Sequence, residues 1–232
     1  VIMGVPHPPG SPLFLLLGNV FSQLPFYQDV GARVNLISPL VSALAVMFLY
    51  LITVQLVEEW RGKVQSITDA VIAYGGAFIG ACTFAVTDSH WFNAVEAEVY
   101  AMATFFTAIV VWLIMKWSQN EGESGNIRYI LLIAYMLGLA SGIHLLNLLT
   151  LPFIALIVYY KKLDFKVSTF LLTGLISIGI YLFIYQGMIK GLPTLSAQFG
   201  IMVPILIVAV SIGIMVFFIK KKNAQLATIF TC

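Results

Sequence analysis

Charged side chains are scarce in this sequence. They make up 9% of its 232 residues, whereas a soluble domain carries roughly 25% because its surface must be hydrated. Apolar side chains account for 60% of the residues, and the mean hydropathy is +0.98. A chain of this composition cannot cover a water-facing globule. We therefore expect lipid to surround most of its surface.

Cysteine and net charge are also low. The two cysteines, Cys82 and Cys232, form neither a disulfide framework nor a metal-binding spacing. A formal charge of +2, without a basic stripe interleaved with aromatic residues, argues against a nucleic-acid partner.

The chain starts at Val1, and the residues before its proline-rich stretch lack the charged and apolar regions of a signal peptide. We expect it to be an internal piece of a longer protein.

The apolar residues fall into runs that are long enough to cross a membrane as helices. A crossing takes about 20 apolar residues for ~30 Å of hydrocarbon. Residues 127–160 would extend about 51 Å as one helix, so we divide them into two short ones. We predict an all-α, polytopic membrane bundle of about seven transmembrane helices, at residues 36–56, 66–86, 100–117, 127–143, 145–160, 167–185 and 202–219. The shorter apolar segment 10–25 is predicted to form an interfacial or re-entrant helix, or one packed on the ends of the bundle.

The basic residues orient this arrangement. Ten of the twelve Lys and Arg residues fall in one set of loops, and only Arg33 and Lys190 fall in the other. Cytoplasmic loops are enriched in Lys and Arg, so the first set is assigned to the cytoplasm. The predicted domains are an extracytoplasmic loop with its interfacial helix at 1–35, a helical bundle at 36–219 and a basic cytoplasmic tail at 220–232. The opposite side then gathers His7, Asp29, Asp88, His90, Glu96, Glu98 and His144.

Two candidate functional residues precede the first span. His7 lies among four prolines between positions 6 and 12, which fix the backbone and can present the imidazole to a substrate. The alternative is an entry turn with Ser11 as N-cap and Pro12 in the first helical turn. Arg33 suits a lipid phosphate, because guanidinium binds phosphate oxygens in bidentate fashion. The alternative is an interfacial arginine that extends to lipid head groups.

Two further polar groups flank later spans. Asn93 and Glu96 have the spacing of a capping box, which explains one carboxylate but not Glu98, predicted as a site residue or as part of a buried ion pair. His144 and Asn147 lie at the predicted division between two short spans, where they either line a site or satisfy backbone groups freed by the break.

Four motifs in this order resemble a bacterial membrane family that long had no known function: HPPGSPLF at 7–14, RVNL at 33–36, WFNAVEAEVYA at 91–101 and GIHLLNLL at 142–149. That family is related to the animal transmembrane O-mannosyltransferase of plexin-type receptor domains. The resemblance covers most of residues 6–195. It implies a GT-C glycosyltransferase fold, in which sugar passes from a polyprenyl-phosphate donor to an acceptor on the extracytoplasmic side.

The first outer loop of such enzymes carries an acidic catalytic motif, followed by a helix along the membrane that segment 10–25 fits. In relatives, an Asp-x-Gly-Glu-like motif precedes the His-Pro-Pro-Gly run. Only residues 1–6 precede it here, so the catalytic residues stay unknown, and we expect truncation rather than an inactive enzyme.

The resulting hypothesis is transfer of a hexose, mannose in the first instance, to a protein hydroxyl, in a bacterial inner membrane with the site facing the periplasm. Arg33 is predicted to bind the donor phosphate. The predicted pocket-lining residues are His7, His90, Glu96, Glu98, His144 and Asn147. Membrane lipid, the polyprenyl-phosphate sugar and a protein acceptor are the expected partners. We predict no metal site and no cofactor, and the use of a divalent metal stays open. The alternatives are a transporter or flippase for a lipid-linked or small polar substrate, and a non-catalytic bundle subunit.

Overall fold

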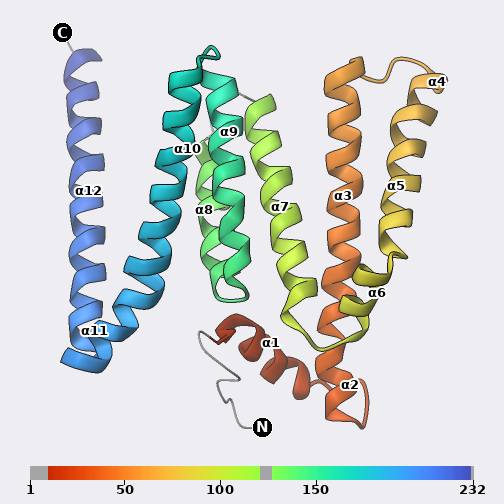
Figure 1. Cartoon of the computed structure of the whole chain (residues 1–232), viewed down its shortest axis with the longest axis horizontal. Coiled ribbons are helices and arrows are strands. Elements are labelled where there is room, and N and C mark those ends of the chain that lie inside the picture. Colours follow the sequence, from red (N-terminus) through yellow and green to blue (C-terminus); the bar gives the residue numbers. More distant parts are fainter. Residues whose placement is uncertain (1–9, 121–126, 231–232) are drawn as a thin grey trace. The chain divides into compact units, whose positions relative to one another are not determined.

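The computed structural model of the protein describes residues 10–120 and 127–230, and within these ranges every regular element is a helix (Figure 1). The predicted all-α class is confirmed. The helices group by their contacts into two compact units, Val1–Gly174 and Leu175–Cys232. The predicted boundaries at residues 35 and 219 rest on charge and hydropathy, and they stay predictions.

The first unit begins with short helices and continues with long apolar ones. Its elements are α1 (Pro12–Ser22), α2 (Val30–Asn35), α3 (Ile37–Arg61), α4 (Ile67–Ala70), the π-helical turn η1 (Val71–Gly75), α5 (Gly76–Ala85), α6 (Asp88–Val95), α7 (Val99–Gln119), α8 (Ile127–Ser141), the 3-10 segment η2 (Leu145–Leu149), α9 (Thr150–Lys162) and the start of α10 (Val167–Leu182). The second unit contains the end of α10, the π-helical segment η3 (Phe183–Gly191), α11 (Leu192–Phe199) and α12 (Met202–Phe230). Gly200, at φ 82°, reverses the chain between α11 and α12, a conformation that favours glycine.

Five helical stretches of the described chain are long and apolar enough to cross a membrane: Val30–Arg61, Ile67–Ala85, Val99–Gln119, Leu145–Lys162 and Val167–Phe199. The expected number of about seven is therefore corrected. The 15 residues of α8 reach only about 22 Å, less than the ~30 Å of hydrocarbon. The helix α12 contains the apolar stretch Met202–Ile214, and the predicted span at residues 202–219 stays a prediction. The predicted division of residues 127–160 is confirmed, because α8 ends at Ser141 and the chain continues into η2 at Leu145.

The core of the first unit forms around α7. One cluster of buried residues joins α3, α7 and the end of α8, and it consists of Ile37, Met102, Phe106, Ala140 and Ile143. Four apolar side chains of α1 pack against this cluster: Leu13, Phe14, Leu17 and Phe21. Segment 10–25 thus contains a helix that rests on the end of the bundle, which was one of its predicted positions (Figure 1).

The helices of the first unit sort its polar residues to opposite ends. Figure 1 shows α1, α2, α6 and the α8–α9 connection at one end, and the α3–α4 and α9–α10 connections at the other. We call the first the α1 end. The second is the basic end, and the chain segments there carry Arg61, Lys63, Lys116, Arg128, Lys161, Lys162 and Lys166. The sorting agrees with the charge pattern, and the assignment of the basic end to the cytoplasm stays a prediction.

Candidate functional site

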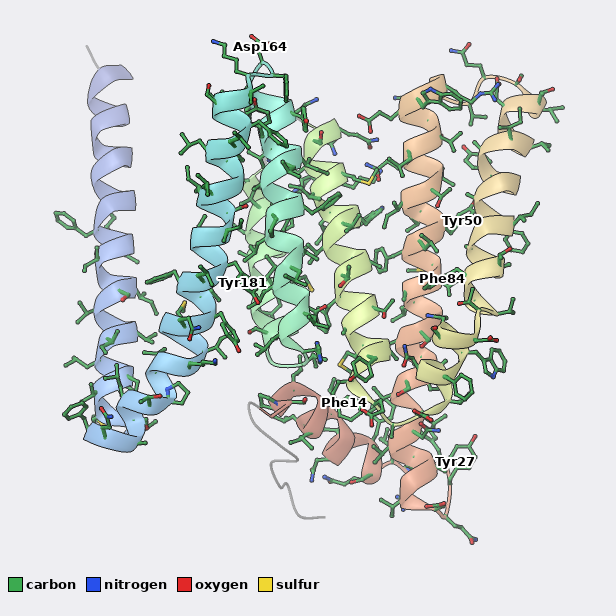
Figure 2. The ribbon with its side chains drawn as sticks, viewed as in Figure 1. Phe14, Tyr27, Tyr50, Phe84, Asp164 and Tyr181 are labelled. Carbon is green, nitrogen blue, oxygen red and sulfur yellow. The ribbon has the colours of Figure 1, made fainter. Side chains whose placement is uncertain are left out.

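Separate segments of the first unit meet at the α1 end through side-chain and backbone contacts. The amide of Leu13 in α1 donates to the carbonyl of Gly142 at 3.1 Å, which ties α1 to the α8–α9 connection. Asn35 Nδ2 donates to the Val95 carbonyl at 2.8 Å, which ties the end of α2 to the end of α6. Figure 2 shows Phe14 and Tyr27 at this end of the unit and Asp164 at the basic end. These contacts bring residues far apart in the sequence into one region.

Gly142 allows α1 to approach the α8–α9 connection closely. A Cβ at this position would lie 3.2 Å from the Leu139 carbonyl oxygen and 3.5 Å from the Leu13 Cβ. The contact with the Leu139 carbonyl would be tight and the contact with Leu13 ordinary, so a side chain that extends beyond Cβ would meet α1.

Arg33 lies in the last turn of α2, whose N-cap is Asp29. Its Nη1 donates to the Leu24 carbonyl at 3.0 Å, and Nη2 makes a longer contact of 3.5 Å to the Gln28 carbonyl. These bonds hold the segment that connects α1 to α2. A guanidinium has five N–H donors, so others remain for a phosphate. Its Nε is buried and has no partner among the residues that the structure describes. The predicted role in binding the donor phosphate stays a prediction.

His90 lies inside the unit, and not on its surface. It projects from α6, is 5% exposed, and its ring centroid lies 4.3 Å from that of Phe84 at the end of α5. Burial lowers the pKa of His90 below its usual 6.5, although the backbone of Ser42 opposes that shift. His90 is therefore neutral at pH 7, and it contacts α3 and α5 rather than the open surface.

Glu96 and Glu98 are both exposed, on either side of the turn between α6 and α7. The predicted capping box is wrong, because Asn93 lies within α6 and Glu96 follows its C-terminus. The buried ion pair, one of the two alternatives for Glu98, is excluded, since this residue occupies the N-cap position of α7 at the surface. Its role as a site residue stays a prediction. The Glu98 amide donates to the Glu96 carbonyl at 2.8 Å, so the turn is tight. A carboxylate before α7 is favourable beside the positive end of its helix dipole.

His144 begins the η2 segment. Its Nδ1 accepts from the Leu146 amide at 3.2 Å, which leaves the proton of a neutral ring on Nε2. The ring centroid lies 5.4 Å from that of Tyr100, in the first turn of α7. His144 is half-buried, so this contact places an imidazole beside the turn that carries Glu98.

Asn147 is 3% exposed, and its side chain amide is paired on both sides. Its Oδ1 accepts from Thr107 Oγ1 at 3.0 Å, and its Nδ2 donates to the Ala140 carbonyl at 3.3 Å. These bonds tie η2 to α7 and to the backbone at the end of α8, where the Ala140 carbonyl also accepts from the Ile143 and His144 amides at 3.0 Å each. They agree with the structural alternative for this residue.

The predicted site residues therefore occupy two layers. Arg33, Glu96, Glu98 and His144 lie at the α1 end with some surface exposed, and His90 and Asn147 are buried behind them. His7 lies outside the described residues. Sequence reasoning missed Tyr100 and the polar residues Asn35, Ser38 and Ser42, although the last three recur at intervals of three and four along an otherwise apolar helix.

The family comparison fits the part of the chain that builds this end. The family model described as the Protein O-mannosyl-transferase TMEM260 N-terminal domain matches residues 1–167. The chain belongs to this family. The match runs through the first unit to the start of α10 and includes all four motifs of the predicted resemblance.

Two curated members of the family show how much of their length this chain represents. The Protein O-mannosyl-transferase tmem260 of Dictyostelium discoideum is 26% identical over 164 residues, which cover 65% of this chain and 18% of that protein. The Protein O-mannosyl-transferase TMEM260 of Mus musculus is 25% identical over 138 residues, which cover 60% of this chain and 18% of that protein. The chain thus spans about a fifth of the length of these relatives. No solved structure matches it.

Proposed function

We propose that this chain is part of a membrane glycosyltransferase that transfers a hexose, mannose in the first instance, from a polyprenyl-phosphate donor to a protein hydroxyl. The observation that carries the proposal is the family match over residues 1–167, whose curated relatives are named protein O-mannosyltransferases. We further propose that transfer occurs on the extracytoplasmic side, in a bacterial inner membrane with the α1 end facing the periplasm.

The distribution of charge supports this sidedness. The basic end of the first unit carries most of its Lys and Arg residues, and cytoplasmic segments are enriched in these residues. The α1 end carries the exposed carboxylates Glu96 and Glu98, the half-buried His144 and the half-buried Arg33. A donor phosphate and a protein acceptor would both reach this end from the membrane surface.

The proposed reaction is a substitution at the anomeric carbon of the donor sugar. The acceptor oxygen forms a bond to that carbon and gives its proton to a general base. The bond between the anomeric carbon and the phosphate oxygen breaks, and polyprenyl phosphate leaves with the electron pair. The general base is expected to be the carboxylate of the family's acidic motif, which precedes the His-Pro-Pro-Gly run.

Arg33 is the proposed group that stabilises the leaving phosphate. Its N–H donors that do not bind the Leu24 and Gln28 carbonyls would meet the negative charge that develops on the phosphate oxygens. Glu96, Glu98 and His144, together with His7, would bind sugar or acceptor hydroxyls. His90 and Asn147 would support the site from behind.

The test is a transfer assay with radiolabelled polyprenyl-phosphate mannose in membranes that contain the full-length parent protein. We expect Arg33→Ala to lower the protein-bound label at least tenfold at unchanged expression. The Arg33→Lys variant keeps the positive charge but not the bidentate guanidinium, and it should retain part of the transfer. Arg128→Ala at the basic end is the matched control and should transfer normally. Unchanged transfer by Arg33→Ala refutes the phosphate role.

One observation favours the alternative of a transporter or flippase. Gln55 in α3 is 4% exposed, and neither polar atom of its amide has a partner within the described ranges. A flippase moves the labelled lipid across the membrane without attaching sugar to protein. Label recovered in protein supports the enzyme, and label that only changes leaflet supports the alternative.

A further inference from the structure

The hydroxyl groups of the long helices in this chain usually turn back onto their own helix. In the first unit Thr53, Thr83, Thr104 and Thr173 each donate to the carbonyl four residues earlier, at 2.8 to 2.9 Å. This arrangement satisfies a hydroxyl in an apolar environment without any other partner. It is the expected behaviour of a serine or threonine that has no role beyond packing.

Ser38 and Ser42 in α3 do not follow this pattern. Their side chains are 0% and 4% exposed, yet neither Oγ has a hydrogen-bond partner in the described part of the chain. An orphaned buried polar group costs about 1–3 kcal/mol, and a serine can avoid the cost by rotating its hydroxyl toward its own helix. Neither hydroxyl is satisfied in this way.

The position of α6 shows what these hydroxyls face. Asn35 precedes Ser38 and Ser42 by three and seven residues, so the three share one face of the helix. Asn35 binds the Val95 carbonyl at the end of α6, and the backbone of Ser42 lies near His90, closer to the start of α6. The two helices therefore run antiparallel along this contact, with Ser38 between its two ends.

Two further orphaned atoms lie on this interface. His90 Nε2 and Asn35 Oδ1 are buried, and neither has a partner among the described residues. Together with the two hydroxyls they offer an imidazole nitrogen, an amide acceptor and two groups that donate as well as accept. We call Ser38, Ser42 and His90, with Asn35 at the edge, the α3–α6 polar cluster.

The charge of this cluster limits its ligand. No acidic or basic side chain lies between residues 36 and 57 of α3 or anywhere in α5, and Asp88 on α6 is exposed. Burial lowers the pKa of His90, so its ring is neutral at pH 7. A neutral set of donors and acceptors selects a neutral hydroxylic ligand over an anion or a cation. Within a helix interface, the smallest such ligand is water, which needs roughly 10–15 Å³ and two to four polar partners.

We propose that the α3–α6 polar cluster is a binding site for buried water, which joins His90 Nε2 to the hydroxyls of Ser38 and Ser42. The bound water holds α6 on α3. Because α6 leads directly into the turn of Glu96 and Glu98, the site also fixes the position of those carboxylates. This inference concerns the fold of the first unit and does not depend on the proposed transfer reaction.

The direct test is radiolytic hydroxyl-radical labelling of the full-length parent protein in nanodiscs, followed by mass spectrometry. Hydroxyl radicals form from water, so a residue buried from solvent is oxidised only where water is bound beside it. We expect oxidation of His90 in the wild-type protein and at least a fivefold loss in the Ser38→Ala/Ser42→Ala variant. Thr53→Val, which removes a self-satisfied hydroxyl from the same helix, should leave the label unchanged. Absence of His90 oxidation in the wild-type protein overturns the proposal.

A double-mutant cycle supplies a second, independent measurement. Amide exchange of residues 88–95 is compared for Ser42→Ala, His90→Phe and the double variant. If water joins the two side chains, each single variant exchanges its amides faster than the wild type. The double variant then exchanges little faster than either single variant. If the hydroxyl has no partner, Ser42→Ala leaves exchange unchanged or slows it, and the proposal fails. The pair Thr53→Val and His90→Phe should be additive.

Discussion

Asn147 holds the α8–α9 turn together from the inside, and its replacement by alanine tests how that part of the site is built. The variant removes the acceptor of the Thr107 hydroxyl and one donor to the Ala140 carbonyl, which still accepts from the Ile143 and His144 amides at 3.0 Å each. A buried group that loses its partner costs about 1–3 kcal/mol. The Thr107 hydroxyl can turn toward its own helix, so its contribution to the free-energy cost is about 0.6 kcal/mol, the average for interhelical hydrogen bonds in membranes. The Ala140 carbonyl keeps its two backbone donors, so the lost bond from Asn147 adds about 0.8 kcal/mol, and we expect a total of about 1.4 kcal/mol.

The loss can be measured as local opening in the full-length parent protein. A change of about 1.4 kcal/mol corresponds to roughly tenfold faster amide exchange at residues 142–150. Thr107→Val keeps the bond from Asn147 to Ala140 and should accelerate exchange only about threefold. Asn19→Ala removes an exposed amide that accepts from Gln23, and it should leave this segment unchanged. Exchange that rises less than twofold in Asn147→Ala would refute the reasoning, because the buried amide would then not hold the turn.

The other predictions concern single contacts. Gly142→Val should separate α1 from the α8–α9 connection and make residues 12–22 more sensitive to limited proteolysis. Gly138→Val is the control and should not have this effect, because a Cβ at position 138 would meet no atom of the described residues within 4 Å. Tyr159→Phe should speed amide exchange at residues 163–169 about tenfold, because the buried hydroxyl accepts from the Lys166 amide at 2.9 Å; wild-type exchange in this variant would contradict it. Since burial lowers the pKa of His90, its protonation favours the opened form of α6. Protection of residues 88–95, corrected for intrinsic exchange, should be constant above about pH 6.5 and fall below it, and His90→Gln should abolish that fall.

Chain length and charge predicted the larger features because they act on whole helices. A helix over residues 127–160 would exceed the bilayer, and the break falls where Gly142 and His144 interrupt the apolar run. In the first unit, Lys and Arg residues gather at one end because successive long helices reverse the chain, while the side of the membrane that this end faces stays a prediction. The number of spans was too high because α8 is apolar but shorter than the membrane is thick.

The errors arose where a short element or a distant contact decides the outcome. The α6 helix occupies only eight residues, so the polar run around Asn93 was interpreted as the start of the next span when it is the end of a separate helix. The partners of Arg33 are carbonyls in an irregular segment, and their positions depend on how α1 rests on the core. The stripe of Asn35, Ser38 and Ser42 is visible in the sequence, but its counterpart on α6 depends on tertiary packing.

The interior of the first unit argues for chemistry at one end rather than passage through the bundle. A transporter requires polar groups that continue across the midplane, at a pathway lined from both sides. The buried face of α7 is apolar along the whole helix, and it consists of Ala101, Met102, Phe106, Val110, Leu113, Ile114, Met115 and Trp117. Gln55 interrupts this environment as a single residue from α3, whereas the polar contacts of Asn35, His90, His144 and Asn147 all lie toward the α1 end. A polar surface at one end of the unit, beside the apolar buried face of α7, suits a reaction between a lipid-borne donor and an acceptor that stays on one side of the membrane.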